Sequence, residues 1–428
     1  GILRVQDIPE PAWGQSYDII VAGSGSAGTY CALSSAKEGR KVLLLEKTRW
    51  CGGMHIQGLV NGYYYGGRGG LYEETDTKTA ALAKELFYDM TDAKRLVVGE
   101  ILEEKGIEAA TSSIVVGLYA EDNRITGVRA CLGTKITDIQ CGMLVDATSD
   151  GHLLRLLPVR THIGRGTDNS TQPFSSVRSV YLDKNQYDGG LRVTAGNVSG
   201  RYGVYHEYRD NGYVNQYDGE QFTDAIIRAH ASHLKTLAST ARFLYLAPLI
   251  GVREGMLFEG EQTLTLKNVL EDKEKPENVL YCCFSDVDKH GSDLAFDEPD
   301  YQNWFVNCNM STCTVYIPVP VGSVVPKGWK GVITTGRCLS MDSYVNSAVR
   351  MNTDAFRIGE ACGILASMAL DFSASPMHVP YPKLKEKLLS CGLLEAEENR
   401  KPSFWTPALG KDRRFVTWMT QTEETTDA

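Results

Sequence analysis

Residues 17–46 read YDIIVAGSGSAGTYCALSSAKEGRKVLLLE, and this stretch decides the fold. The segment 17–22 is short and apolar, and a glycine follows it directly, which is typical of a buried strand. Residues 27–38 have the pattern of a helix that ends at Gly39, and residues 41–46 form a second apolar strand. So short a β–α–β crossover predicts a parallel sheet and an α/β fold.

The turn between the first strand and the helix, GSGSAG at 23–28, fits the pattern GxGxxG. Gly23 permits the tight turn, Gly25 lets backbone N–H groups approach a pyrophosphate, and Gly28 lets the helix pack on the strand. The helix N-terminus then faces the anion with the positive end of its dipole. Glu46 ends the second strand, where an acidic residue can accept hydrogen bonds from ribose hydroxyls. The alternatives are an ordinary βα turn and a solvated strand end.

A second region, far along the chain, distinguishes FAD from NAD. A predicted strand at 331–335 leads into Gly336 and Arg337, and the predicted helix that follows carries Gly359 and Gly363. These two glycines are four residues apart and share one helix face, which allows close packing. FAD is long and needs contacts from separated chain segments, so the return of the chain to the same site favours FAD.

Charge and cysteine usage exclude several classes of partner. The 428 residues include 44 basic and 53 acidic side chains, giving a net charge of −9, which argues against nucleic acid or an anionic membrane as the main partner. No apolar run reaches the ~18 residues that span a bilayer. The eleven cysteines are scattered without metal-ligand spacing, so no metal site is predicted and reduced thiols favour a cytoplasmic location.

The chain is predicted to contain a split domain and an insertion. Residues 16–150 and 326–395 would form a Rossmann-like FAD-binding domain with a parallel sheet, and residues 151–325 an inserted, sheet-rich substrate domain, because they lack a second β–α–β pattern. Residues 1–16 are predicted to be an irregular arm. Residues 396–428 form a C-terminal extension whose aromatic side chains would dock onto the body or onto another subunit, so a homo-oligomer is left open.

Several stretches, in order and at plausible spacings, resemble the FAD-dependent oxidoreductase family of the glutathione-reductase-type fold, which is distantly related to fumarate reductase and succinate dehydrogenase flavoproteins. Besides the opening stretch, they are GGMHIQGLVN at 52–61, LVDATSDG at 144–151, RGTDNSTQPFS at 165–175, IGVREGMLFEG at 250–260, IPVPVGSVVPKGWKGVITTGRCLS at 317–340 and VRMNTDAFRIGEACGILA at 349–366. The resemblance covers nearly the whole chain.

The resemblance implies FAD contacts at particular residues. Gly23, Gly25, Gly28 and Glu46 would hold the ADP half, Gly52 and Gly53 would lie along the pyrophosphate and flavin, and Asp146, Gly336, Arg337 and Gly359 would lie near the FAD. The sequence also departs from the family pattern. Relatives often carry a histidine–glutamate pair where this chain has Ser343-Tyr344, a serine where it has Gly255, and Ala-Thr where it has His55-Ile56. Substrate and mechanism therefore cannot be inherited from the family.

Three residues are predicted to be catalytic. His290, in DVDKHG, is the first candidate for proton transfer, since the pKa of histidine lies near neutrality. His55 is the second because it lies beside Gly52 and Gly53, and it or Cys51 could instead attach FAD covalently. Arg253 would bind a carboxylate or oxyanion, or pair with Glu254. The alternative for His290 is a solvated loop histidine, and Arg350 invites the same two interpretations as Arg253.

The predicted function is FAD-dependent oxidation of a small polar organic molecule by hydride transfer from a C–H bond to flavin. One alternative is reduction of an activated C=C bond, as in fumarate reductase relatives. An alternative of another class is a redox-silent protein that binds FAD for stability. A nicotinamide-linked disulfide reductase is excluded, because there is no second GxGxxG and no CxxxxC dithiol near Gly52. The electron partner is left open.

Overall fold

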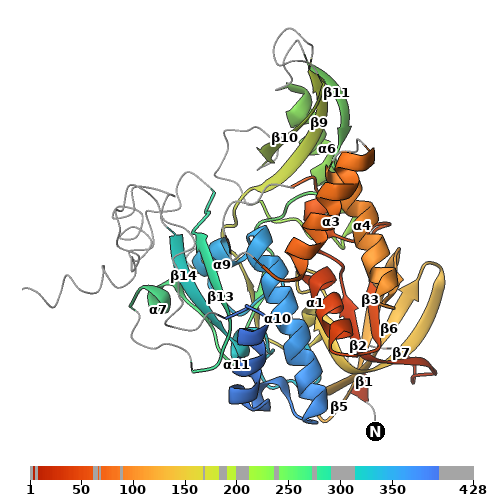
Figure 1. Cartoon of the computed structure of the whole chain (residues 1–428), viewed down its shortest axis with the longest axis vertical. Helices are drawn as coiled ribbons and strands as arrows, with labels where there is room; N and C mark the ends of the chain where they lie inside the picture. Colours follow the sequence, from red (N-terminus) through yellow and green to blue (C-terminus); the bar gives the residue numbers. More distant parts are fainter. Residues whose placement is uncertain are drawn as a thin grey trace, which may run out of the picture.

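A computed structural model describes residues 3–4, 8–60, 66, 69–86, 90–166, 169–182, 190–198, 212–235, 241–271, 277–290 and 314–394. Its centre is an eight-stranded sheet with the order β1-β5-β6-β7-β2-β3-β4, in which β15 also pairs with β7 (Figure 1). The strands are β1 (Leu3–Arg4), β2 (Trp13–Ala22), β3 (Val42–Leu45), β4 (Glu108–Ala110), β5 (Ser113–Glu121), β6 (Arg124–Leu132), β7 (Lys135–Asp146) and β15 (Val332–Thr334). The predicted C-terminal extension, 396–428, lies outside the described residues.

The part of this sheet that carries the nucleotide motif is parallel, as predicted. β2 pairs in parallel with β3 and β7, and β3 pairs in parallel with β4. The long strand β7 changes partner along one edge: residues 135–140 pair antiparallel with β6, whereas Leu144, Val145 and Asp146 pair in parallel with β15. A strand from late in the chain therefore extends the parallel part of the sheet, with β7 between it and β2.

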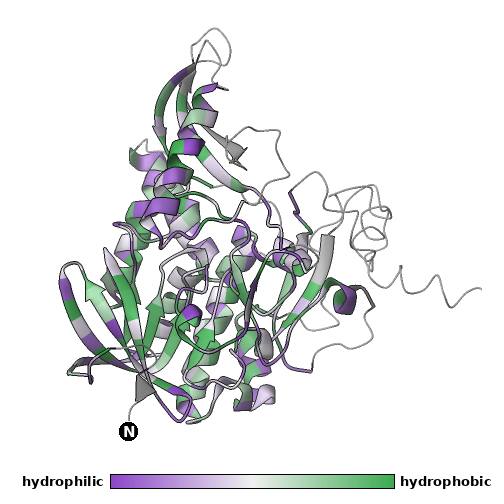
Figure 2. Ribbon diagram, turned by 180° about the vertical axis from the view of Figure 1, so that it is seen from behind, coloured by the Kyte–Doolittle hydropathy of each residue, from purple (hydrophilic) through white to green (hydrophobic). Residues whose placement is uncertain are grey.

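Both faces of the parallel strands are buried, which explains why these segments read as continuous apolar runs. Ile19 and Val21 face a core shared with the helices, whereas Ile20 and Leu144 face a second core on the other side of the sheet. Figure 2 shows the same distribution, with apolar residues concentrated on the central strands. The sheet is thus a middle layer between two hydrophobic cores.

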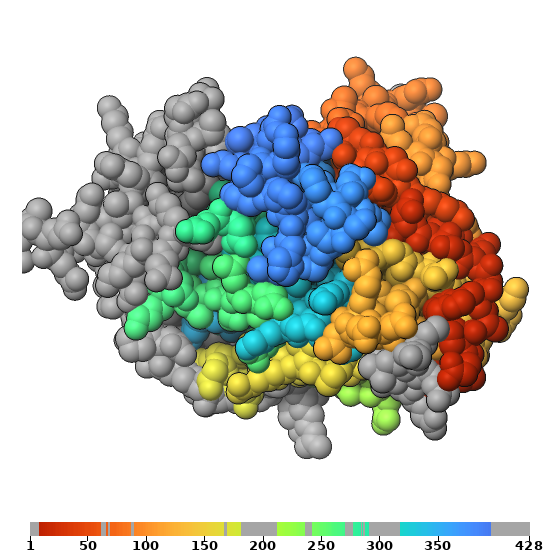
Figure 3. Space-filling model, turned by 90° about the horizontal axis from the view of Figure 1, so that it is seen from below, coloured from red at the N-terminus to blue at the C-terminus, as the bar shows by residue number. Residues whose placement is uncertain are grey.

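Two helices cover the first face and pack tightly against each other: α1 (Ser26–Lys37) and α10 (Asn352–Asp371). A Cβ at Gly359 would overlap the carbonyl oxygen of Ala27, and one at Gly363 would lie 2.5 Å from that of Cys31. The shared glycine face predicted from the sequence is therefore what brings these helices together. In Figure 3, the blue residues from late in the chain lie directly beside the red residues from its beginning.

The remaining elements surround this core. They are α2 (Gly53–Ile56), α3 (Leu71–Leu86), α4 (Met90–Glu104), η1 (Leu154–Leu156), β8 (Thr161–Ile163), β9 (Phe174–Leu182), β10 (Gly190–Val198), α6 (Gly219–Lys235), β11 (Ala241–Leu246), β12 (Met256–Phe258), α7 (Leu266–Glu271), β13 (Val279–Asp286), β14 (Thr314–Pro320), η2 (Val321–Ser323), α9 (Ser343–Val349), η3 (Pro376–His378) and α11 (Tyr381–Ser390). β9, β10 and β11 form a sheet that projects with α6 at the top of Figure 1.

Two expectations about local structure need correction. The predicted sheet-rich insertion, 151–325, also contains the helix α6, whose buried residues Ala225, Ala229 and Ser232 follow a helical spacing. The predicted irregular arm contains β1 and the first residues of β2, because β2 continues to pair with β7 as far back as Trp13. Among the described residues, no helix combines the length and the apolar character needed to cross a membrane.

Candidate functional site

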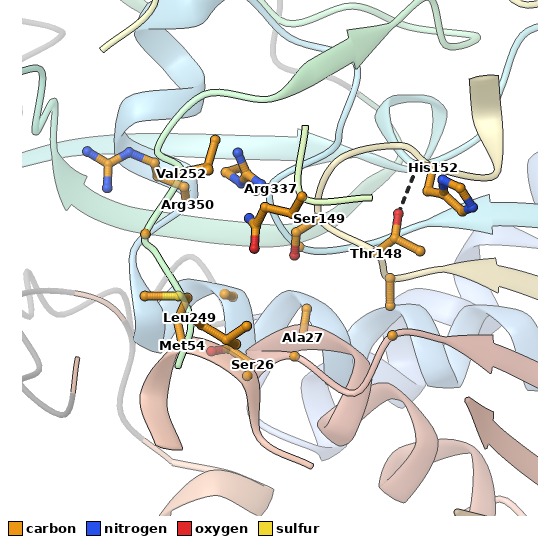
Figure 4. A pocket seen from close by; sticks show the side chains of 18 of the residues that line it. Ser26, Ala27, Met54, Thr148, Ser149, His152, Leu249, Val252, Arg337 and Arg350 are labelled. Carbon is orange, nitrogen blue, oxygen red and sulfur yellow. Dashed lines mark hydrogen bonds between the residues drawn. The ribbon is translucent and has the colours of Figure 1, made fainter. Parts of the chain in front are cut away.

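A cavity of about 560 Å³ opens at the carboxyl ends of the parallel strands. Its lining includes Gly23 after β2, Glu46 after β3, Ala147 after β7 and Gly336 after β15. In open α/β sheets this edge is where ligands bind. Figure 4 shows Arg350 and His152 at opposite ends of the cavity, with Arg337 and Ser149 between them. The cavity is therefore elongated, and segments far apart in the sequence form its walls.

The glycine turn takes the conformation that its sequence predicts. Gly23 has φ of +102°, in the left-handed region that favours glycine, and Gly25 is the N-cap of α1. Gly23 and Gly25 line the cavity, so the backbone at the start of α1 is accessible to a ligand. Gly28 does not line it, because its role is packing: a Cβ there would overlap the carbonyl oxygen of Gly23.

Glu46 lines the cavity, but its carboxylate is already occupied by the protein. Oε2 accepts hydrogen bonds from the backbone and hydroxyl of Ser24, at 2.9 and 2.8 Å. Oε1 accepts from the backbone and hydroxyl of Thr48, at 2.8 and 2.7 Å. A carboxylate has about four lone-pair positions, and these bonds use them. Glu46 therefore fixes the two loops around it, and its predicted ribose contact stays a prediction.

Asp146 is fully buried and shapes the cavity without lining it. Oδ1 accepts from the backbone and hydroxyl of Thr148, and Oδ2 from the backbone N–H groups of Leu153 and Leu154. These bonds hold the turn that follows β7. Within it, Ser149 has φ of +63°, an unusual conformation for a residue other than glycine and one that clusters at functional sites. Asp146 thus shapes the cavity indirectly, by holding the turn whose residues Thr148 and Ser149 line it.

Arg337 places a buried positive charge in the middle of the cavity. It lines the cavity, and its Nη1 has no hydrogen-bond partner among the described residues. Its nearest carboxylate is Asp150, with 3.9 Å between Nη2 and Oδ1. Burial lowers the pKa of Arg337, although Asp150 opposes this. A guanidinium whose Nη1 is unoccupied by any described residue, in the same cavity as the N-terminus of α1, fits the pyrophosphate of a dinucleotide.

The departure at Gly255 has a structural reason. A Cβ at this position would overlap Asp150 Oδ1 and would lie 2.9 Å from Arg337 Nη1. A serine, as relatives often carry here, would therefore displace the Asp150–Arg337 pair. The position of the Asp150–Arg337 pair therefore requires glycine at 255.

The end of the cavity that contains Arg350 gathers side chains suited to proton transfer and anion binding. Arg253, Asp288, His290 and Arg350 all line it. His290 Nε2 lies 3.2 Å from Asp288 Oδ2, and Arg350 Nη2 donates to the same oxygen at 3.0 Å. Burial opposes ionisation of Asp288, but its hydrogen bond with His290 and the charges of Arg350 and Arg253 hold its pKa well below the usual range. Asp288 is therefore ionised at neutral pH.

His290 is held as a neutral imidazole. Burial lowers its pKa, although the bond with Asp288 opposes this. Its backbone N–H donates to Gln172 Oε1 at 2.8 Å. Gln172 is buried, and its own backbone N–H donates to Glu254 at 2.9 Å. The segment that carries His290 is therefore fixed by a buried polar network.

Glu254 is the anionic centre of that network. Its Oε1 lies 2.9 Å from Lys289 Nζ, with side-chain exposures of 2% and 1%. Ser343 hydrogen bonds to both. Burial would raise the pKa of Glu254, but Lys289, Ser343 and the Gln172 amide together lower it. Ser343, at the position where the resemblance predicted a histidine, thus bridges the Glu254–Lys289 ion pair by hydrogen bonds. Arg253 donates to the Pro173 carbonyl instead of pairing with Glu254.

The structure separates the residues predicted around Gly52. Gly53 lines the cavity, and a Cβ on it would lie 2.6 Å from Gly25 Cα. Gly52, with φ of +103°, is the N-cap of α2 behind it. His55 and Gly359 are also outside the described lining, since His55 is buried against Phe356 at 5.5 Å between ring centroids. His55 therefore has no direct access to the cavity in this structure.

Several residues that line the cavity were not predicted from the sequence to be site residues: Lys47, Thr148, Ser149, His152, Gln216, Tyr217 and Asp288. A local signal existed for three of them. Thr148 and Ser149 lie within the LVDATSDG stretch, and Asp288 precedes His290 by two residues. No local pattern marks Tyr217, because only folding brings its segment to the strand ends.

The sequence profile of the family described as FAD dependent oxidoreductase matches residues 18–199 and 181–388. The chain belongs to this family. FAD is its cofactor, and it is an oxidoreductase rather than a flavin-binding structural protein. The buried Arg337 and the exposed backbone at the start of α1 fit the FAD pyrophosphate. The finer relationship to glutathione reductase and fumarate reductase stays a prediction.

Individual relatives match over short stretches or at low identity. Vinyl phenol reductase from Lactiplantibacillus plantarum is 60% identical over 38 residues, which are 9% of this chain and 8% of that protein. Among solved structures, p-nitrophenol 4-monooxygenase from Pseudomonas putida shares 11% identity at a TM-score of 0.44, covering 96% of this chain and 98% of that one. L-proline dehydrogenase from P. horikoshii shares 11% identity at a TM-score of 0.38, covering 89% and 100%.

Proposed function

We propose that this protein oxidises a small organic anion by removing a hydride from a C–H bond while His290 accepts a proton. The observation that carries the proposal is a shared cavity. The nucleotide motif lines it together with Arg253, Asp288, His290 and Arg350. When bound, FAD supplies the acceptor of the hydride.

Each polar side chain at this end has a distinct role in the proposal. Arg253 and Arg350 bind the carboxylate or oxyanion of the substrate and orient it. His290, neutral at physiological pH, takes the proton from an O–H or N–H group. Asp288 stays ionised and stabilises the imidazolium that forms, since its oxygens lie 3.1 and 3.2 Å from Nε2. The network around Glu254 keeps the segment of His290 in place.

The opposite direction, reduction of an activated C=C bond, is the second candidate. Two arginines at one end of the cavity would also suit an unsaturated acid, and the short match to a vinyl phenol reductase supports a C=C substrate. In that direction His290 would donate the proton. The domain division of the prediction also stays a proposal: 16–150 and 326–395 would bind FAD, and 151–325 would supply the substrate contacts.

The test is anaerobic spectroscopy of the FAD-loaded protein. The oxidised protein is mixed with hydroxy acids, amino acids, amines and sugars, and the reduced protein with unsaturated acids and vinyl phenols. Bleaching of the visible flavin band by a hydroxy acid or amino acid supports the main proposal, and recovery of the band with an unsaturated compound supports the second. No spectral change with any compound in either direction would contradict both.

Variants then separate binding from proton transfer. We expect Arg253→Met and Arg350→Met to weaken binding of the anionic substrate far more than that of its uncharged amide. His290→Gln should slow the reaction by about 10²–10⁴-fold with little change in binding. The control is Arg242→Met, because Arg242 is exposed on β11 and does not line the cavity.

A further inference from the structure

The end of the cavity that contains Glu46 is enclosed by three side chains from three separate segments. Lys47 follows β3, His152 belongs to the turn after β7, and Tyr217 precedes α6. Lys47 and His152 both follow strands of the nucleotide-binding sheet. Tyr217 lies on residues 215–222, here called the strap, which come from the predicted insertion. The strap therefore crosses from the insertion to the nucleotide end of the cavity.

The His152 and Tyr217 rings form a parallel stack, with 3.9 Å between centroids and an interplanar angle of 9°. Two contacts fix His152. Its Nε2 lies 3.2 Å from the Val115 carbonyl oxygen, and its backbone N–H donates to Thr148 Oγ1 at 2.9 Å. Tyr217 is fixed by its backbone N–H, which donates to Asn215 Oδ1 at 3.1 Å. Both rings line the cavity, and their stack joins the strap to the turn after β7 at this end of it.

Lys47 ties the strap to the sheet. Its Nζ donates to the Gln216 carbonyl at 3.1 Å and lies 4.3 Å from the centroid of the Tyr217 ring. Burial lowers the pKa of Lys47 to about 8, although Glu46 and Asp150 oppose this. A buried ammonium in a nucleotide cavity would be stabilised by an anionic ligand.

The strap is built as an ordered segment. Asp218 Oδ1 accepts from the backbone N–H groups of Glu220 and Gln221, at 3.0 and 3.1 Å, and so caps the start of α6. Phe222 packs at the edge of a separate core cluster that includes Phe174. The strap is therefore anchored at two points. Lys47 joins it to the loop after β3, and Phe222 joins it to the core cluster of the insertion.

We propose that the strap closes over the adenosine end of FAD, that the Tyr217–His152 stack and Lys47 hold it closed, and that FAD leaves only when the strap lifts away from His152 and Lys47. The glycine motif and Glu46 mark this end of the cavity as the adenosine end. The insertion thereby controls retention of the cofactor as well as contributing residues at the other end of the cavity.

The test uses FAD, ADP and FMN as separate probes of the apoprotein. For Tyr217→Ala we expect about tenfold weaker binding of FAD and ADP, the magnitude of losing the aromatic stack that holds the strap closed, and unchanged binding of FMN, which lacks adenosine. FAD release, followed by flavin fluorescence after dilution, should accelerate by a similar factor. Tyr217→Phe should retain wild-type affinity because it keeps the ring. Lys47→Met should accelerate release with a smaller loss of affinity.

The control variant is Tyr245→Ala, since Tyr245 is 46% exposed on β11 and is not among the lining residues. The thermal midpoint of each apoprotein tests folding, and Tyr217→Leu replaces Tyr217→Ala if the latter unfolds. The proposal would be overturned if Tyr217→Ala bound FAD and ADP as tightly as the wild type does. It would also be overturned if the variant lost as much affinity for FMN as for FAD. Tighter ADP binding by the variant would show that the ring blocks the site instead of closing it.

Discussion

At Gly255, the absence of a side chain allows Asp150 to lie beside Arg337, which lines the cavity. We expect Gly255→Ser to weaken FAD binding by at least tenfold, because the new Cβ would overlap Asp150 Oδ1 and move Arg337. Titration of the apoprotein with FAD measures this. Gly99→Ser is the matched control, since a Cβ at Gly99 meets nothing within 4 Å. Unchanged FAD affinity in Gly255→Ser would mean that Arg337 does not contact the cofactor.

The protonation of His290 sets the expected pH dependence of flavin reduction. Burial lowers the pKa of His290, with the charges of Arg253 and Arg350 acting in the same direction and Asp288 opposing them. The neutral, proton-accepting form therefore persists below pH 6.5, the ordinary value for histidine. The rate of reduction should stay level at neutral pH and fall only as the pH drops through this lowered pKa.

Stopped-flow reduction at a series of pH values checks this prediction. The His290→Gln variant should reduce the flavin slowly at every pH, and its rate should no longer fall at acidic pH. A fall at acidic pH that persists in His290→Gln would assign the titration to another group and would contradict the role of His290 as proton acceptor.

Between elements, the pair of Glu254 and Lys289 joins the segment before β12 to the one after β13. Lys289→Met would leave Glu254 as a buried charge without its ammonium partner, which costs about 3–5 kcal/mol of the free energy of unfolding. The double variant Glu254→Gln/Lys289→Met should recover much of this loss. Urea unfolding measures both, and a loss in the double variant as large as in Lys289→Met would show that the charge balance is unimportant.

Helix α9 begins with a buried cap whose effect depends on pH. Asp342 is the N-cap and accepts from the backbone N–H groups of Val345 and Leu266, at 2.8 and 2.7 Å. Burial raises its pKa from 3.8 to about 6, although these bonds oppose the shift. The folded protein therefore binds a proton that the unfolded chain has lost between these pH values, so its stability falls as the pH rises through this window.

Asp342→Asn removes that titration while keeping a side chain that can cap the helix. We expect the free energy of unfolding of the wild type to fall, relative to that of Asp342→Asn, as the pH rises from about 4 to about 6. Asp342→Ala should be about 1 kcal/mol less stable than Asp342→Asn at any pH because it lacks the cap. Chemical denaturation at several pH values provides the comparison, and a constant difference between wild type and Asp342→Asn would contradict the raised pKa.

At the scale of the whole molecule, the packing of the cavity predicts that FAD is held without a covalent bond. His55 and Cys51, the two candidates for attachment, are not among the described lining residues, and burial raises the pKa of the Cys51 thiol to about 11. All of the yellow colour should therefore appear in the supernatant after acid precipitation. Flavin that stays with the pellet, and is lost from it in His55→Ala or Cys51→Ala, would overturn this prediction.

The sequence by itself determined the nucleotide-binding unit and the cofactor. The strand, glycine turn and helix at 17–39 follow from apolar spacing and from backbone freedom at Gly23, which are local properties. The glycine face of α10 could also be predicted, because Gly359 and Gly363 are four residues apart on any helix. The family resemblance placed Gly336 and Arg337 near the cofactor, and both line the cavity.

Only the tertiary structure decided how the candidate site is assembled. His290 acquired Asp288 and Arg350 as neighbours, whereas His55 became a core residue against Phe356. Tyr217 carries no local signal, since its position at the cavity depends on the path of the insertion. Local patterns report backbone conformation and periodic burial, whereas the environment of a polar side chain depends on segments that meet only when the chain packs.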